Sequence, residues 1–452
     1  MRRIQLSDHF TIPLLLRCAL PSIGMQLVDN SYQVADGFFI SNYIGETAFE
    51  AENLIFPPLF VVMAVGLMFG TGASALIARD LGEGRKEQAS RILSQAMAVL
   101  ALLSVILSVA LYFLLPSITV WIGADAEMAP DCIVYGRMLS FFMPFQMLSM
   151  AFHPLLITAE RPGLGLAATV VNAAANILLD WLFMAVFGWG LQGAALATGL
   201  AWVASAVIPL FYFMNKKNPL HFTAPSRDLR SLGRTVYNGA SEMADAVSYA
   251  AVAVIFNLQL LRWMGNDGVG AYAVSEYVSG LYIAIFYGIS MSMVPVVGYR
   301  LGKKDVPALR SLRRTAFTLM GLLGLGLAAL SFSLAYPLSR IFVGYSEDLT
   351  AKSVEALEII SLSYIVGGIT TCSSSYFTGL NQGTASLVIA SVKGFFGPLV
   401  CIFLLPPLLG SSGLWYATPA AEILTLLTAV PFFLHWKKKE ASGDLPEPDE
   451  DA

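Results

Sequence analysis

The stretch SYQVADGFFI, from Ser31 to Ile40, lies inside a long apolar run and carries a carboxylate, Asp36, in its middle. The same run, which covers residues 12–40, holds a second carboxylate, Asp29. A helix needs roughly 20 apolar residues to cross a bilayer, and this run is longer than that. An ionisable side chain inside such a helix is costly and usually faces a cavity or a partner. The stretch therefore predicts a membrane helix with a functional polar face.

The composition of the chain is typical of a polytopic helical membrane protein. Its 452 residues are 56% hydrophobic and 13% charged, whereas soluble domains average about 25% charged residues. The four cysteines and four histidines are scattered and show no disulfide or metal-site spacing. We expect no cofactor, no nucleic-acid partner and no metal beyond Na⁺. Apolar runs predict twelve spans, near residues 12–40, 48–78, 88–115, 127–158, 162–187, 190–214, 232–264, 267–300, 307–337, 350–379, 384–408 and 413–436.

Basic residues are distributed unequally between the two sides of these spans. If the N-terminus is cytoplasmic, 21 of the 27 lysines and arginines fall in inside segments and three in outside loops. Cytoplasmic loops of membrane proteins carry such an excess. The bias predicts a multi-pass protein of the cell (inner) membrane with both termini in the cytoplasm.

The chain also repeats itself at an offset of about 220 residues. Leu81-Gly82 falls on Leu301-Gly302, and Gly193 falls on Gly413. Each half holds six spans, an even number, so the halves share one orientation about an axis along the membrane normal. The sequence thus predicts an N-terminal six-helix lobe (1–214), a cytoplasmic linker (215–231), a C-terminal six-helix lobe (232–436) and a disordered cytoplasmic tail (437–452).

Polar side chains in both halves follow helical spacing. In the first span, Asp29, Gln33 and Asp36 share one face, and in the fifth span Asn172, Asn176 and Asp180 share another. Two nearby carboxylates in a low dielectric cannot both stay ionised cheaply, so such a pair shares a proton or binds a cation. The alternative is that these groups only hold helices together through hydrogen bonds. Repeated carboxylates favour the functional interpretation, because amides would do the same at lower desolvation cost.

The second half carries charged groups as well. Glu242 and Asp245 lie on the seventh span, Glu276 on the eighth, Lys393 on the eleventh and Glu422 on the twelfth. Glu276 and Lys393 could simply neutralise each other. In the first span, Pro21 removes a backbone hydrogen bond and predicts a kink that could serve as a hinge.

Four groups of motifs give the chain a family resemblance over residues 10–436. They are ALPSIGMQLVDNSYQVADGFFI (19–40), ITAERPGLG (157–165), NAAANILLD (172–180) with GLQGAALAT (190–198), and the second-half counterparts GLNQGTAS (379–386) and GLWYATPAAE (413–422). With these motifs the chain resembles the multidrug and toxic compound extrusion (MATE) family of secondary transporters, DinF-like or MepA-like branch.

This resemblance implies a fold, a function and a site. The fold is an all-α polytopic membrane protein of twelve transmembrane helices in two pseudo-symmetric six-helix lobes that form a V. The function is export of amphipathic, mostly cationic small molecules in exchange for H⁺ or Na⁺, by a monomer in the lipid bilayer. The coupling residues implied are Asp36, Asn176, Asp180 and Thr198, with Pro21 as the hinge. The second-lobe site of other branches is incomplete here, because the tenth span has no carboxylate.

Other interpretations stay open at this point. Major-facilitator transporters also have twelve spans in two parallel halves, and lipid-linked oligosaccharide flippases belong to the wider superfamily. A membrane-embedded enzyme is disfavoured, because the chain shows no His-Glu-x-x-His motif, no aspartyl-protease signature and no cofactor loop. The sequence does not choose between H⁺ and Na⁺.

Overall fold

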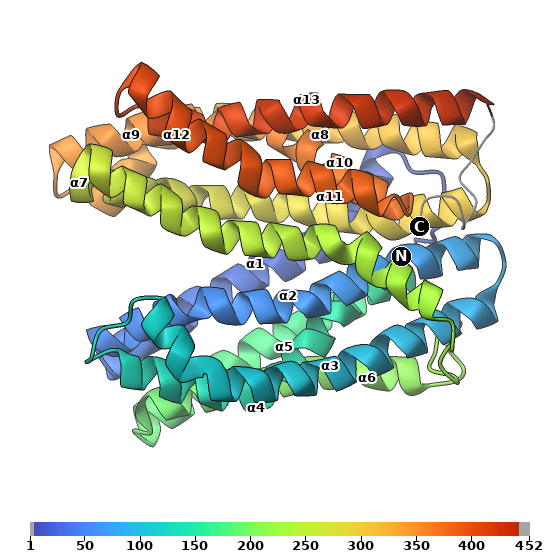
Figure 1. Ribbon diagram of the computed structural model, residues 1–452, viewed down its shortest axis with the longest axis horizontal. Coiled ribbons are helices and arrows are strands. Elements are labelled where there is room, and N and C mark those ends of the chain that lie inside the picture. Colours follow the sequence, from blue (N-terminus) through green and yellow to red (C-terminus); the bar gives the residue numbers. More distant parts are fainter. Residues whose placement is uncertain (1–3, 443–452) are drawn as a thin grey trace.

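A computed structural model describes residues 4–442, and these residues form helices joined by short loops, with no strand among them. The first group of helices is α1 (Ile12–Tyr43), α2 (Glu46–Gly82), α3 (Lys86–Trp121), α4 (Ala129–Thr158), α5 (Pro162–Asp180), the π-helix η1 (Trp181–Val186) and α6 (Gly190–Met214). The second group is α7 (Leu229–Gly302), α8 (Val306–Val343), α9 (Glu347–Ser361), α10 (Tyr364–Gly379), α11 (Gly383–Ser391), the π-helix η2 (Val392–Phe396), α12 (Gly397–Leu409) and α13 (Gly413–Ser442). Figure 1 shows the two groups as two lobes lying side by side.

The described residues contain enough apolar helix for the twelve predicted spans. Ten helices are long and apolar enough to cross a membrane, and the pair α9 and α10, bent by 47°, forms one more. One of the ten is α7, whose Gly265 has φ 67° and ψ −159°, outside the helical region. The chain reverses there (Figure 1), so α7 is two spans. Glycine has no Cβ and adopts this positive φ without strain.

The backbone repeats the internal duplication seen in the sequence. Three residues with positive φ in the first half each have a counterpart 220 positions later that also has positive φ. Such conformations are uncommon and end or separate helices, so their recurrence in register shows that the two halves break their helices at matching points. The pairs are Gly45 with Gly265, Gly84 with Lys304, and Gly190 with Gly410.

One prediction about the C-terminus is wrong. We expected residues 437–452 to be disordered, but α13 continues to Ser442. The cause is Glu440, which is only 5% exposed. Its carboxylate accepts two hydrogen bonds from Arg313, at 2.8 and 3.1 Å, and one from Trp436 Nε1 at 2.8 Å. These charge-assisted bonds fix the last turns of the helix against α8. The rest of the predicted tail lies outside the described residues.

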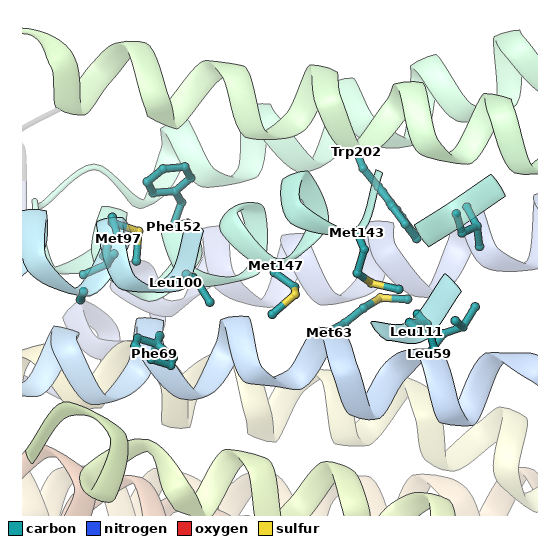
Figure 2. Close-up of a cluster of buried hydrophobic side chains, with 14 of the residues drawn as sticks. Leu59, Met63, Phe69, Met97, Leu100, Leu111, Met143, Met147, Phe152 and Trp202 are labelled. Atoms are coloured by element: carbon teal, nitrogen blue, oxygen red, sulfur yellow. The ribbon is translucent and has the colours of Figure 1, made fainter. Parts of the chain in front are cut away.

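Helix α1 belongs to both lobes. Its first half is buried with second-lobe side chains, among them Leu15 against the cluster of Tyr282 and Phe286. Its second half is buried in the first-lobe core, where Ile40 packs with Ile55. That core lies between α2, α3, α4 and α6, and methionines such as Met63, Met143 and Met147 fill it beside Trp202 (Figure 2). Pro21 lies inside α1, close to where the helix passes from one lobe to the other.

The two lobes meet closely at the end that carries the basic loops. A Cβ added to Gly72 of α2 would lie 1.9 Å from the Thr235 carbonyl oxygen of α7, and one added to Gly239 would lie 1.9 Å from the Met68 oxygen. Gly82 and Gly302 make matching contacts with Tyr299 and Arg79, respectively. Small residues let membrane helices approach backbone to backbone, where van der Waals packing is the main attraction. These glycines therefore hold the lobes together at this end.

The segment before α1 ties the same end together. Leu6 N–H donates to the Glu160 carboxylate of the first lobe at 2.9 Å. Arg300 of the second lobe donates to the carbonyl oxygens of Ser7 and Asp8, both at 2.7 Å. The segment thus bridges the lobes through hydrogen bonds to charged groups, which are stronger than neutral ones.

We predict that Gly72→Val separates the lobes at this end, because its side chain has no room against the Thr235 carbonyl. Spin labels on cysteines introduced at Glu87 and Lys303, both exposed, report the distance between the lobes. The distance should lengthen by several ångströms in the variant. The control is Gly233→Val, because an added Cβ at Gly233 meets nothing within 4 Å. An unchanged distance distribution in Gly72→Val would contradict the proposed contact.

Candidate ion-coupling site

The structure brings together the four residues implied as the coupling site. Asp36 of α1 is 4% exposed, and Asp180, the last residue of α5, is fully buried. Asn176, one turn earlier on α5, donates from Nδ2 to Thr198 Oγ1 of α6 at 3.1 Å. The carboxyl group of Asp36 lies next to those of Asp180 and Glu52 and interacts with both of them and with Asn176. The polar faces of α1 and α5 therefore meet in the first lobe.

Several oxygen atoms of this cluster have no hydrogen-bond donor. They are Asp36 Oδ1, Asn176 Oδ1 and both carboxylate oxygens of Asp180. Buried polar atoms are nearly always partnered, and each exception calls for an explanation. A proton shared between the carboxyl groups, or a cation held between them, would satisfy these atoms. In the described part of the chain no three His, Cys, Asp or Glu side chains are arranged to hold a metal ion, so a cation here would rely on the amide and hydroxyl oxygens as well.

Asp180 lies at the boundary between an α-helix and a π-helix. The α-helix α5 ends at Asp180 and the π-helix η1 starts at the next residue. A π-helix shifts the backbone hydrogen bonds from i→i−4 to i→i−5 and occurs frequently at functional sites. Within η1, the ring of Phe183 stacks on that of Trp189, with centroids 4.9 Å apart. Asp180 therefore lies at the junction of an α-helix and a π-helix.

Sequence reasoning missed one carboxylate of the cluster, Glu52 of α2. Its side chain interacts with Asp36 and with Tyr135 of α4, and Tyr135 in turn lies next to Thr198. Glu52 was overlooked because it falls near the start of the predicted span 48–78, where an acidic residue is unremarkable at the membrane surface. The available signal was an acid inside a predicted span. With Glu52 the site is built by α1, α2, α4, α5 and α6.

The other first-lobe residues predicted to line the cavity lie apart from this cluster. Asn172 is buried and faces Tyr32 of α1, which also contacts Trp202. Asp29 is half-buried, and Gln33 is exposed. That Gln33 and Asp29 line the substrate cavity stays a prediction.

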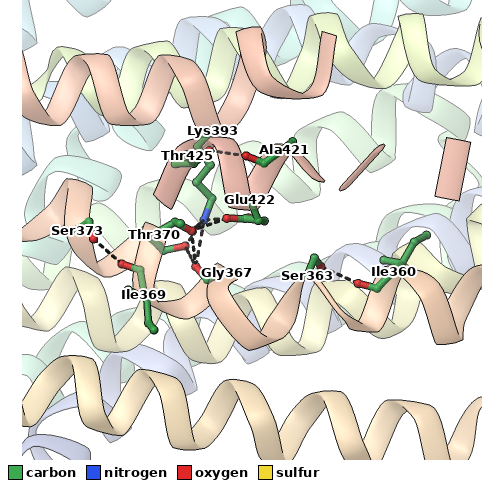
Figure 3. A network of polar contacts seen from close by, with 11 residues as sticks. Ile360, Ser363, Gly367, Ile369, Thr370, Ser373, Lys393, Ala421, Glu422 and Thr425 are labelled. Atoms are coloured by element: carbon green, nitrogen blue, oxygen red, sulfur yellow. Dashed lines mark hydrogen bonds and ion pairs between the residues drawn. The ribbon is translucent and has the colours of Figure 1, made fainter. Parts of the chain in front are cut away.

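In the second lobe, the predicted charged residues form separate contacts. Glu242 accepts a hydrogen bond from Tyr287 O–H at 2.7 Å. Lys393 pairs with Glu422 at 3.4 Å (Figure 3). The pairing of Lys393 with Glu276 considered from the sequence is therefore wrong; Glu276 instead interacts with Tyr272. Asp245 Oδ1 lies beside Gly394, the residue after Lys393.

Comparisons with known proteins agree with this architecture. The sequence model of the MatE family matches residues 21–182 and again 243–403. The "Probable multidrug resistance protein YoeA" of Bacillus subtilis is 24% identical over 95% of this chain and 94% of its own length. The "Multidrug export protein MepA" of Staphylococcus aureus is 21% identical over 93% of this chain and 91% of its own length. A solved mutant of the Vibrio cholerae MATE transporter VcmN superposes with a TM-score of 0.88 at 20% identity, over 96% of this chain and 98% of that one.

These findings define a polytopic transporter of the MATE type, not an enzyme. The chain belongs to the MatE family, because the family model covers well over half of it. The two matches begin at residues 21 and 243, close to the offset of the internal repeat. Membership decides against the major-facilitator and enzyme interpretations, and it identifies a multi-pass membrane protein.

We predict that Glu52→Gln raises the melting temperature of the purified protein by about 2–4 °C in sodium-free buffer. An amide removes one of three crowded carboxyl groups and can donate a hydrogen bond to Asp36. Sites built for function commonly give up stability in this way. The matched control is Glu50→Gln, which changes an exposed acid on the same helix and should leave the melting temperature unchanged. A lower melting temperature for Glu52→Gln would contradict the crowding of like charges.

Proposed function

We propose that this protein is a cation-coupled antiporter that exports amphipathic, cationic small molecules across the cell membrane. The observation that carries the proposal is the buried pair of Asp36 and Asp180, in which Asp36 Oδ1 and both Asp180 oxygens lack hydrogen-bond donors. Either H⁺ or Na⁺ entering this site would remove the conflict between the two carboxyl groups. The names of the relatives, which give multidrug export for MepA and probable multidrug resistance for YoeA, support the same interpretation.

Helix α1 connects the site to the two lobes. Asp36 lies on the half of α1 that packs in the first lobe, whereas the half around Leu15 packs in the second. Loading the site would change how α1 packs on α5, and Pro21 would let the two halves of the helix move separately. Proline permits this because it removes one hydrogen bond from the helix ladder. Binding at Asp36 would thereby favour one arrangement of the lobes over the other.

The orientation follows from the basic loops. If the positive-inside bias holds, the end closed by Gly72, Gly239 and Arg300 faces the cytoplasm. The described conformation is then closed toward the cytoplasm and corresponds to an outward-facing state. We place both termini in the cytoplasm and treat the transporter as a monomer.

The energetics allow such coupling. One positive charge entering across 100 mV supplies about 2.3 kcal/mol. Since 1.4 kcal/mol corresponds to a factor of ten, one ion exchanged for an uncharged substrate sustains a gradient of roughly fortyfold. Export of a monovalent cation moves one positive charge outward, so it needs a second entering ion to gain the same drive from the membrane potential. The acidic groups of both lobes, including Glu242 and Asp245, would attract cationic rather than anionic substrates.

We predict that Asp36→Asn and Asp180→Asn each abolish efflux of a cationic dye, a loss of at least tenfold, while the protein stays in the membrane. Each substitution keeps the shape but removes a group that must bind and release the ion. Dye efflux from cells that express each variant measures this, with expression checked by immunoblot. Glu50→Gln is the matched control. Efflux at the wild-type rate in either variant would refute the site.

The same assay identifies the ion. Collapse of efflux on adding a protonophore, with no effect of removing sodium, assigns H⁺. Loss of efflux on replacing sodium by choline assigns Na⁺. Efflux that persists in both conditions would contradict ion coupling of either kind.

We predict that Pro21→Ala slows efflux several-fold without lowering stability, because alanine restores the missing helix bond and stiffens α1. Pro116→Ala, in α3 of the first lobe, is the control and should transport normally. If Pro21→Ala transported as fast as the wild type, hinge motion at this residue would play no part in the cycle.

A further inference from the structure

The second lobe holds a half-buried ammonium group surrounded by oxygen atoms (Figure 3). Lys393 Nζ lies 3.3 Å from the Gly367 carbonyl oxygen, 3.2 Å from Thr370 Oγ1 and 3.4 Å from Glu422 Oε1. It also donates to Thr371 Oγ1. We call the four oxygens of Gly367, Thr370, Thr371 and Glu422 the oxygen cage. Neither the coupling site nor the proposed transport step uses it.

The hydroxyl groups of the cage are oriented as cation ligands. Thr370 and Thr371 donate their hydrogens to the Gly367 carbonyl oxygen, at 2.9 and 2.8 Å. Thr370 Oγ1 also lies within hydrogen-bonding reach of Glu422. With their hydrogens directed to Gly367 or Glu422, the two hydroxyls present lone pairs to Lys393 Nζ. The cage would therefore keep its polarity if the ammonium were removed.

The number of oxygens exceeds what an ammonium group can use. A lysine ammonium has three N–H donors, whereas four cage oxygens surround Nζ. A spherical cation has no such limit, and carboxylate, carbonyl and hydroxyl oxygens are the ligands that hard cations prefer. Glu422 supplies the one carboxylate among the four cage oxygens, and the carboxylate of Asp245 lies close enough to interact electrostatically with both Lys393 and Glu422. The oxygen cage thus has the composition of a cation site.

Each lobe has a π-helix in its fifth span, although the two do not coincide in the 220-residue repeat, where Lys393 falls on Ala173. Lys393 lies in the π-helix η2, within the fifth span of the second lobe. In the first lobe, the fifth span contains the π-helix η1, directly preceded by Asp180. The same span thus carries an acid beside its π-helix in one lobe and a lysine within it in the other. In the first lobe, the carboxylate oxygens of Asp180 lack hydrogen-bond donors. In the second lobe, the ammonium group of Lys393 supplies donors to the oxygen cage.

We propose that the oxygen cage is a second monovalent-cation site, which the chain fills with the ammonium of its own Lys393. Potassium and ammonium ions, which are close in size to a lysine ammonium, are the ligands it would take once Lys393 is removed. Because this ammonium is part of the chain, the oxygen cage of the second lobe is permanently occupied by a positive charge. If the proposed function holds, only the first-lobe site then exchanges ions during transport.

A simple ion pair between Lys393 and Glu422 makes a different prediction. A buried ion pair that loses one partner is left with an uncompensated charge, which is strongly destabilising. Nothing in that account lets a small inorganic cation take the place of the lost side chain. A preformed cage does, because Gly367, Thr370 and Thr371 remain in place. The side chains of Lys393 and Glu422 are 25% and 14% exposed, so ions can reach the site.

The test uses the purified full-length protein in which Asp36→Asn and Asp180→Asn silence the first-lobe site. Lys393→Ala is added to this parent, and melting temperatures are compared in choline chloride, potassium chloride and ammonium chloride at equal ionic strength. We expect potassium or ammonium to raise the melting temperature of the Lys393→Ala protein by about 2–4 °C at saturation. The parent with Lys393 should show no such rise, and adding Glu422→Gln to Lys393→Ala should remove it.

Two outcomes overturn the proposal. One is a melting temperature of the Lys393→Ala protein that does not depend on the cation, and the other is a rise that survives Glu422→Gln. Lys393→Met, which keeps the apolar stem, is measured in parallel. If neither variant purifies as a monodisperse protein, ammonium chloride during purification should rescue it, and failure of that rescue also overturns the proposal. Because the readout is stability, the result is independent of whether the protein exports dyes.

Discussion

The carboxyl groups of Asp36 and Asp180 lie side by side where neither is solvated. In a low dielectric, like charges at short range repel strongly, and each ion also loses its hydration. The cluster is therefore stable only with a positive charge or a proton between its members. That requirement links the occupancy of the site to the fit of α1 against α5. Because α1 also packs in the second lobe, a change in its packing around Asp36 also changes its contacts with the second lobe.

The contacts between the lobes suit a connection that must open. At the closed end, the helices of α2 and α7 approach through glycines, so the attraction depends on backbone van der Waals contact rather than on interlocked side chains. Such a surface can separate without repacking a core, because each lobe keeps its own hydrophobic cluster. Arg300 adds directional bonds to the chain before α1, which break together when the segment moves. This end of the molecule thus combines close backbone packing through glycines with a few hydrogen bonds from Arg300.

The sequence predicted the features that depend on helical spacing of polar residues and on the length of apolar runs. The spans follow from hydropathy, and the polar faces within α1 and α5 follow from helical spacing, since i, i+4 and i+8 must share a face. That Asp36 meets Asp180 was implied by the family resemblance, because spacing within a helix does not say which helices pack together. The sequence did not predict contacts that depend on how helices distant in the chain pack against each other. Glu52 reaches the site only because α2 lies against α1, and Lys393 pairs with Glu422 because η2 packs against α13. The final turns of α13 were missed because their stability comes from Arg313, far away in the chain.

The two lobes share a duplicated fold but carry different charged residues near the π-helices of their fifth spans. Both fifth spans contain a π-helix, whose widened turn frees backbone and redirects the side chains next to it. In the first lobe this turn adjoins an acid that needs an external positive charge. In the second it presents a lysine that provides one. A charge fixed to the chain cannot dissociate, so it cannot carry energy from an ion gradient. An asymmetry of this kind lets one lobe respond to ions while its partner keeps a constant charge and shape.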